Sequence, residues 1–134
     1  MRDWLYVRDH CEAIRLALAR GRPGATYNIG ADAERTNLDV VTSILSIVDE
    51  LRPSSAPRRT LIKHVTDRPG HDRRYAMDAA RIRTELGWKP RHAFESGLRS
   101  TVEWYLANTT WVKAVTSGEY RRWIETNYRS RGAP

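Results

Sequence analysis

Apolar residues recur every three or four positions in several stretches of the chain, which is the spacing of an amphipathic α-helix. Asp9 predicts the start of the first helix, because its carboxylate and that of Glu12 can cap the free N–H groups there. Gly21 predicts the end of this helix. A second helix is predicted from Asn37, a typical capping residue, to Leu51.

The second half of the chain has the same helical spacing. Asp78 predicts the cap of a short helix that Gly87 closes, and Phe94 begins a longer helix. Further short helices are expected around Trp111 and Trp123. The chain has 134 residues and no internal repeat of fixed period, so one compact unit is the default expectation.

Three short stretches, 2–7, 26–29 and 61–65, contain the β-branched and aromatic residues that favour β-strands. Strands this brief need neighbours for their backbone N–H and C=O groups. Helices that alternate with strands normally pack on a shared sheet. We therefore expect a partner chain or a further domain to supply the rest of that sheet.

Composition narrows the class of protein. Cys11 is the single cysteine, which excludes an intrachain disulfide and favours a cytoplasmic protein. The four histidines have no zinc-like spacing, so no metal site is expected. No apolar run approaches the ~20 residues of a membrane-spanning helix, so neither membrane insertion nor secretion is expected. The net charge of +7 favours anionic partners, which include nucleotides and nucleic acids.

One candidate binding segment is the charged stretch 67–75, where Pro69 and Gly70 disfavour a regular helix. Guanidinium groups can bind phosphate oxygens bidentately, and a histidine can donate a further hydrogen bond. Its basic residues are Arg68, His71, Arg73 and Arg74. Taken alone, the pattern is more typical of a solvated loop.

Two polar residues at strand ends are further candidates. Arg2 precedes one apolar stretch and Asn28 closes another, and ligands of open α/β sheets bind at strand ends. Both could also be ordinary surface residues. The aromatic residues between Trp104 and Tyr128 could stack on a base, although packing explains them more simply.

Two catalytic signatures are missing from the sequence. No Gly-x-Gly-x-x-Gly loop follows a strand candidate, so no dinucleotide-binding residue is assigned. No tyrosine is followed four positions later by lysine, so no base with an orienting lysine is assigned. The sequence therefore predicts neither catalytic nor cofactor-binding residues within this chain.

Four segments taken in order resemble the dTDP-glucose 4,6-dehydratases, a family of the extended short-chain dehydrogenase/reductase superfamily of NAD-dependent epimerases and dehydratases. They are Arg-Asp-Trp-Leu-Tyr-Val-x-Asp-His (2–10), Thr-Tyr-Asn-Ile-Gly (26–30), Asp-Arg-Pro-Gly-His-Asp-x-Arg-Tyr-Ala-x-Asp (67–78), and Glu-Leu-Gly-Trp-x-Pro with Thr-Val-Glu-Trp-Tyr-Leu (85–106). Thr-Tyr-Asn-Ile-Gly is shared across the superfamily, whereas the third and fourth segments are more selective.

The resemblance implies an α/β fold, namely the C-terminal substrate-binding lobe of such an enzyme, mostly helical with a few short strands. Residues 1–30 would be the end of the Rossmann-type NAD-binding domain, including its last helix and strand, and 31–134 the sugar-nucleotide-binding domain. The missing Rossmann domain would be the chain's partner and would form the family's homodimer. The chain alone is expected to be inactive.

The family's enzymes use NAD to convert dTDP-glucose to dTDP-4-keto-6-deoxyglucose, an early step in rhamnose biosynthesis. By resemblance, a set of residues in this chain would line the dTDP-glucose diphosphate. They are Arg2, Asn28, Asp67, Arg68, Pro69, Gly70, His71 and Tyr128. The NAD-binding elements, catalytic Tyr and Lys, and the acid/base pair for elimination have no counterpart here.

Two alternatives remain open at this level. A related sugar-nucleotide epimerase or decarboxylase would share Tyr-Asn-Ile-Gly, although the Arg-Pro-Gly-His-Asp loop argues against it. A basic nucleic-acid-binding module would explain the charge and the run from Tyr120 to Trp123, but no groove-reading motif is present.

Overall fold

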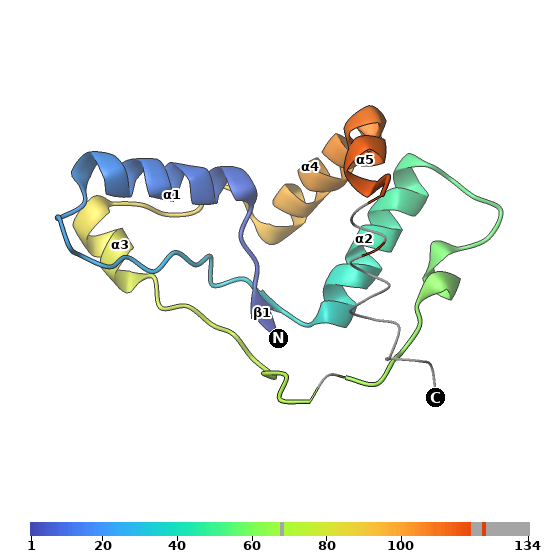
Figure 1. Cartoon of the computed structure of the whole chain (residues 1–134), viewed down its shortest axis with the longest axis horizontal. Helices are drawn as coiled ribbons and strands as arrows, with labels where there is room; N and C mark the ends of the chain where they lie inside the picture. Colours follow the sequence, from blue (N-terminus) through green and yellow to red (C-terminus); the bar gives the residue numbers. More distant parts are fainter. Residues whose placement is uncertain (68, 119–121, 123–134) are drawn as a thin grey trace.

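The computed structural model describes residues 1–67, 69–118 and 122. The described part is mostly helical with one small two-stranded sheet, as the sequence predicts (Figure 1). Its elements in chain order are β1 (Arg2–Asp3), α1 (Val7–Arg20), β2 (Glu34–Arg35), α2 (Asn37–Leu51), the 3₁₀-helix η1 (Arg58–Leu61), α3 (Ala80–Leu86), α4 (Phe94–Ala107) and α5 (Thr109–Thr116).

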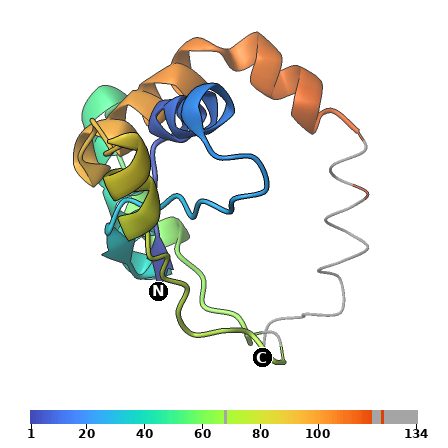
Figure 2. The same ribbon diagram turned by 90° about the vertical axis from the view of Figure 1, so that its left-hand side faces the viewer.

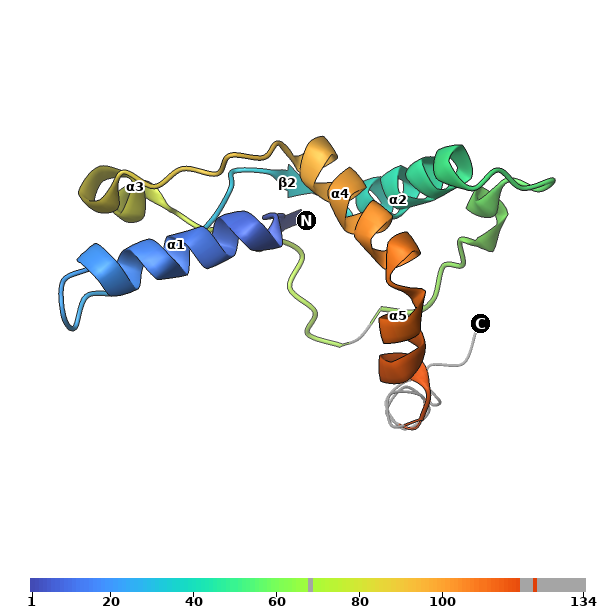
Figure 3. The same cartoon turned by 90° about the horizontal axis from the view of Figure 1, so that it is seen from above.

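The helices form two packed pairs, α1 with α3 and α2 with α4 (Figures 1 and 3). Helix α5 continues from the end of α4 and points away from the α1 and α3 pair (Figures 2 and 3). The pairs meet where Gly97 of α4 faces the start of α1. A Cβ at Gly97 would lie 2.9 Å from the Tyr6 Cβ, so the absence of a side chain allows this close approach.

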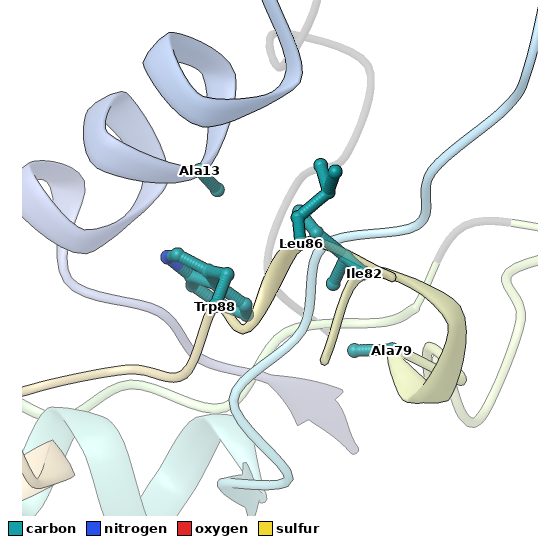
Figure 4. Packing of buried hydrophobic residues seen from close by; sticks show 5 residues of the cluster. All are labelled: Ala13, Ala79, Ile82, Leu86 and Trp88. Atoms are coloured by element: carbon teal, nitrogen blue, oxygen red, sulfur yellow. The ribbon is translucent and has the colours of Figure 1, made fainter. Parts of the chain in front are cut away.

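The core of the first pair is small and apolar (Figure 4). Ile82 is fully buried on α3 and contributes to the same cluster as Ala13 of α1. Trp88 follows α3 and donates from its indole Nε1 to the Asp9 carbonyl oxygen at 3.2 Å. This bond satisfies the polar atom of an otherwise apolar buried side chain.

Strand β1 connects the first pair to the second. It pairs antiparallel with β2, with Arg2 opposite Arg35 and Asp3 opposite Glu34. The Asp3 carboxylate accepts hydrogen bonds from the backbone N–H groups of Ala31 at 3.0 Å and Ala33 at 2.8 Å. The loop before α2 is therefore held against the beginning of the chain.

Two predicted helix starts are corrected by the structure. Helix α1 begins at Val7, and Asp9 lies buried inside its first turn instead of capping it. Helix α2 is capped by Thr36, one residue before the predicted Asn37. The Thr36 Oγ1 accepts from the Asp39 N–H at 3.1 Å, and the Asp39 carboxylate accepts from the Thr36 N–H at 3.1 Å. This reciprocal pair satisfies two N–H groups that have no partner within the helix.

The strand predictions are largely wrong for the described residues. Only Arg2–Asp3 of the stretch 2–7 is a strand, and 26–29 is extended without pairing. The stretch 61–65 begins at the last residue of η1 and continues without regular structure. A strand requires a neighbour for its backbone groups, and the described chain supplies none to these two stretches.

The remaining helices are confirmed as α3, α4 and α5, but the cap predicted at Asp78 is wrong. The N-cap of α3 is Ala79, one residue later, and the Asp78 carboxylate accepts from the Ala80 N–H at 2.9 Å. Gly87 ends α3 in the left-handed conformation with a φ of 66°, which suits a residue without Cβ. The helix predicted around Trp123 lies outside the described residues. Within the described part, no helix has the length and apolar character needed to cross a membrane.

Candidate anion-binding site

The structure brings two of the predicted site residues together from distant parts of the chain. Arg2 lies on β1, and His71 lies in the loop between η1 and α3 that passes beside the start of β1 (Figure 1). The Arg2 Nη2 is 2.7 Å from the His71 Nε2 and donates to the Asp72 carbonyl oxygen at 3.0 Å. The Tyr75 N–H donates to the Met1 carbonyl oxygen at 3.0 Å, which holds the loop against the strand.

The Arg2 guanidinium is held in a defined orientation. Its Nη1 donates to the Met1 carbonyl oxygen at 2.7 Å, and its central carbon lies 4.4 Å from the centroid of the Tyr75 ring. A cation over an aromatic face is attracted by the ring quadrupole. The Nε–H and one N–H of Nη1 make no hydrogen bond to the described residues, so they are open to an anion.

The contacts of His71 define its tautomer. A guanidinium can only donate, so the His71 Nε2 near Arg2 must carry the lone pair. The other ring nitrogen, Nδ1, lies 2.6 Å from a carboxylate oxygen of Asp67 and donates its hydrogen there. In this tautomer, His71 connects the exposed carboxylate of Asp67 to the guanidinium of Arg2.

A second arginine of the loop is occupied by a structural contact. Arg74 makes a bidentate ion pair with Glu34 of β2, including a bond of 2.7 Å from Nε. This hydrogen bond holds the pKa of Glu34 below its ordinary value. The Arg74 guanidinium therefore anchors the loop to the sheet, and it is less available to a phosphate than the sequence pattern indicates.

Among the remaining predicted residues that the structure describes, none is joined to this cluster by a side-chain hydrogen bond. Asn28 is exposed on the extended stretch and makes no side-chain hydrogen bond to the described residues. Gly70 forms the turn of the loop with a φ of 68°, next to the exposed Pro69. Arg68 and Tyr128 lie outside the described residues. Their proposed contacts with a ligand stay predictions.

Sequence reasoning did not assign two residues that shape the site. Tyr75 supports the Arg2 guanidinium through its ring, and its hydroxyl donates to the Asp72 carboxylate. The Asp72 carbonyl oxygen binds Arg2 in turn. Arg2 lies 70 positions before Asp72, and a contact over that distance leaves no periodic signal in the sequence. Only the third resembling segment, which contains Asp72 and Tyr75, indicated their importance.

Comparison of the chain with known proteins assigns its family. The family model described as GDP-mannose 4,6 dehydratase matches residues 1–101. The chain belongs to this family. The matched range includes β1 and the whole loop with His71, so the candidate site lies within the part of the chain that carries the family signal.

Individual relatives confirm the resemblance seen in the sequence. The chain is 56% identical over 131 residues to the dTDP-glucose 4,6-dehydratase of Salmonella typhimurium, which covers 98% of this chain and 36% of that protein. The dTDP-glucose 4,6-dehydratase of Xanthomonas campestris is 55% identical over 123 residues, covering 90% of this chain and 35% of that protein. The chain thus spans about a third of the length of these relatives.

Solved structures agree in fold. The dTDP-glucose 4,6-dehydratase of Bacillus anthracis in complex with NAD superposes with a TM-score of 0.68 and 45% identity, covering 81% of this chain and 32% of that one. The enzyme DesIV of Streptomyces venezuelae, solved with NAD and TYD bound, has a TM-score of 0.68 and 38% identity over the same shares. The fold therefore belongs to a portion of an extended short-chain dehydrogenase.

Proposed function

We propose that this chain is the sugar-nucleotide-binding part of a dTDP-glucose 4,6-dehydratase, and that the group around Arg2 and His71 binds the diphosphate of dTDP-glucose. The observation that carries the proposal is the convergence of β1 and the 67–75 loop on one guanidinium. Two of its N–H groups remain open to a ligand. The relatives named for dTDP-glucose supply the substrate class.

The physical chemistry favours an anion at this position. A guanidinium that donates to phosphate oxygens makes charge-assisted hydrogen bonds, which are about twice as strong as neutral ones. The contacts to Met1, Asp72 and Tyr75 orient Arg2 before a ligand arrives, which lowers the entropy lost on binding. Asn28, Arg68, Pro69, Gly70 and Tyr128 complete the proposed lining, with Asp67 behind His71.

NAD does not fit the residues of this chain. The cofactor needs a glycine-rich loop after a strand, and the sequence contains no such motif. We assign NAD and the hydride transfer to the portion of the relatives that this chain does not match. The proposed contribution of this chain is to hold the nucleotide, so that the sugar is oriented for reaction elsewhere.

The proposed division into 1–30 and 31–134 is supported by the two apolar faces of α1. Ala13 faces α3 in the core, whereas Val7, Ile14 and Leu18 are 64%, 46% and 84% exposed on another face. A helix that is apolar on two sides is typical of a position between two layers. In this proposal, the sheet of a Rossmann-type domain covers the exposed apolar face formed by Val7, Ile14 and Leu18.

We also propose a homodimer and a cytoplasmic location, which are both expected from the resemblance.

Calorimetric titration with dTDP-glucose tests the diphosphate site. The purified protein should bind one equivalent, and Arg2→Ala should weaken the affinity by about tenfold to a hundredfold, because a charge-assisted bond contributes ~1.5–3 kcal/mol. Arg15→Ala is the matched control, because Arg15 pairs with Glu12 on the outer surface of α1. Circular dichroism establishes that each variant is folded.

The affinities of Arg2→Ala and Arg15→Ala distinguish a specific site from a general charge effect. A folded Arg2→Ala protein that binds as tightly as the unsubstituted protein would overturn the assigned site. Equal losses in Arg2→Ala and Arg15→Ala would indicate an effect of net charge alone. The nucleic-acid alternative is tested with a DNA duplex, whose binding would fall steeply with added salt because many phosphate contacts release counterions.

A further inference from the structure

The contacts of His71 conflict with a role as phosphate donor. Its Nε2 accepts from Arg2 at 2.7 Å, and the single N–H of this tautomer points to Asp67 from Nδ1. A phosphate oxygen of a sugar nucleotide is an acceptor, so it cannot bond to a nitrogen lone pair. In this tautomer the ring therefore offers no N–H to the ligand that the site is proposed to bind.

We propose that binding of a nucleoside diphosphate sugar is coupled to uptake of one proton by His71, with Asp67 as the positioning residue that stabilises the resulting imidazolium. This inference rests on the proposed diphosphate site and adds to it a linked protonation. Histidine is the side chain whose charge ordinarily changes between pH 5 and 8.

In the proposed step, a proton from solvent binds the Nε2 lone pair of His71. The hydrogen bond from Arg2 to Nε2 then breaks, because that nitrogen no longer accepts. The new Nε2–H donates to a phosphate oxygen, and the freed N–H of Arg2 turns to the same anion. Nδ1–H continues to donate to Asp67 throughout, so one proton leaves the buffer for each ligand bound.

The charges around His71 explain why the ligand triggers the change. The ring lies between the guanidinium of Arg2, which opposes a positive ring, and the carboxylate of Asp67, which favours it. A diphosphate adds negative charge on the Arg2 side and removes that opposition. The other nearby carboxylate, on Asp72, accepts from the Tyr75 hydroxyl. Asp67 is therefore the counter-charge in direct contact with the ring.

The experiment measures proton uptake directly. The purified protein is titrated with dTDP-glucose by calorimetry at pH 6 to 8.5, in buffers that differ in ionisation enthalpy. The sugar ester is the probe because, unlike a free nucleoside diphosphate, it has no terminal phosphate that titrates near neutral pH. We expect up to one proton per ligand, and a dissociation constant that rises with pH by up to about tenfold per unit.

Three substitutions assign the proton. His71→Gln keeps a side-chain N–H donor that does not titrate, so uptake should vanish and the affinity should no longer depend on pH. Asp67→Asn removes the counter-charge from a side chain that is 75% exposed, so the pH-dependent range should move to lower pH while the fold is retained. His64→Gln removes an exposed histidine outside the site and should change neither quantity.

The measurements distinguish failure of the proton-uptake proposal from failure of the proposed diphosphate site. Binding of dTDP-glucose with no proton uptake and no pH dependence would overturn the inference and leave the diphosphate site in place, with Arg2 acting alone. Undiminished uptake in His71→Gln would overturn it equally. Absence of binding at every pH, by a folded protein, would overturn the proposed function itself.

Discussion

The carboxylate of Asp9 binds His92, a residue 83 positions further along the chain. It accepts from the His92 backbone N–H at 3.0 Å and from the ring Nδ1 at 2.9 Å. Asp9 is 3% exposed, in the first turn of α1, and His92 lies just before α4. These hydrogen bonds connect the two helical pairs and explain why Asp9 does not cap its own helix.

Acid should weaken this connection. Burial raises the pKa of Asp9, but the hydrogen bonds from His92 and from the Arg91 backbone outweigh burial and hold the pKa below 3.8, its ordinary value. The unfolded chain then binds a proton more readily than the folded one. The contribution of Asp9 to stability is therefore complete above about pH 4 and is lost as pH falls through the folded pKa.

Urea unfolding at pH 7 and at pH 3 measures this effect. Asp9→Asn should lower the free energy of unfolding at pH 7 and should show a smaller further decrease toward pH 3 than the unsubstituted protein. Glu12→Gln is a control on the same helix, where the carboxylate pairs with the exposed Arg15. An unchanged acid dependence in Asp9→Asn would contradict the assignment.

Thr36→Ala should destabilise α2 by about 1 kcal/mol, because it removes the side chain that caps the Asp39 N–H. Thermal unfolding followed by circular dichroism measures the loss. Ser46→Ala is the matched control on the same helix, since the Ser46 hydroxyl is exposed and makes no hydrogen bond to the described residues. Its effect should stay within about 0.5 kcal/mol. Equal effects of the two substitutions would argue against the cap.

Gly30→Ala should destabilise the junction between β1 and the following loop. An added Cβ would lie 2.6 Å from the Asp3 Oδ2 and 3.0 Å from the Met77 Cβ. Asp3 cannot easily move away, because its carboxylate already binds the N–H groups of Ala31 and Ala33. Overpacking of this kind costs ~1–3 kcal/mol.

Denaturant unfolding of Gly30→Ala tests this prediction, with Gly118→Ala as the control. A Cβ at Gly118 would meet no atom of the described residues within 4 Å, so that substitution should be close to neutral. Because Asp3 adjoins Arg2, the Gly30 variant should also bind dTDP-glucose more weakly. Full stability in Gly30→Ala would show that the loop relaxes more freely than its hydrogen bonds indicate.

Tyr75 should contribute to ligand binding through its ring more than through its hydroxyl. Tyr75→Leu removes the aromatic face below the Arg2 guanidinium and should weaken dTDP-glucose binding by about twofold to fivefold, which corresponds to ~0.5–1 kcal/mol for an exposed cation–π contact. Tyr75→Phe keeps the ring and is the matched comparison. If the two variants bind equally, the hydroxyl contact with Asp72 is the more important one.

The sequence predicted those structural features that depend on interactions between residues a few positions apart. The apolar spacing predicted α1 to α5 to within a few positions, and Gly87 was predicted as the end of α3. The loop around His71 was predicted as charged and irregular, because Pro69 and Gly70 disfavour a helix. These features depend on backbone preferences and side chains that are close in sequence.

The role of Asp9 shows where such reasoning fails. An aspartate beside the start of a helix is typical of a cap, and nothing local distinguishes it from one that binds a distant histidine. The same holds for Arg74, which the pattern offered to a phosphate and which the structure pairs with Glu34. Strand predictions at 26–29 and 61–65 failed because pairing depends on a neighbour that the stretch itself does not specify.

The sequence by itself determined the helices, the composition of the candidate loop and, through four short segments, the family. Only the tertiary structure decided that Arg2 meets His71, that Asp67 sets the tautomer of that ring and that Tyr75 supports the guanidinium. The physical reason is that helix formation depends on contacts three or four residues apart, whereas a binding site is made by residues whose proximity exists only after the chain has folded.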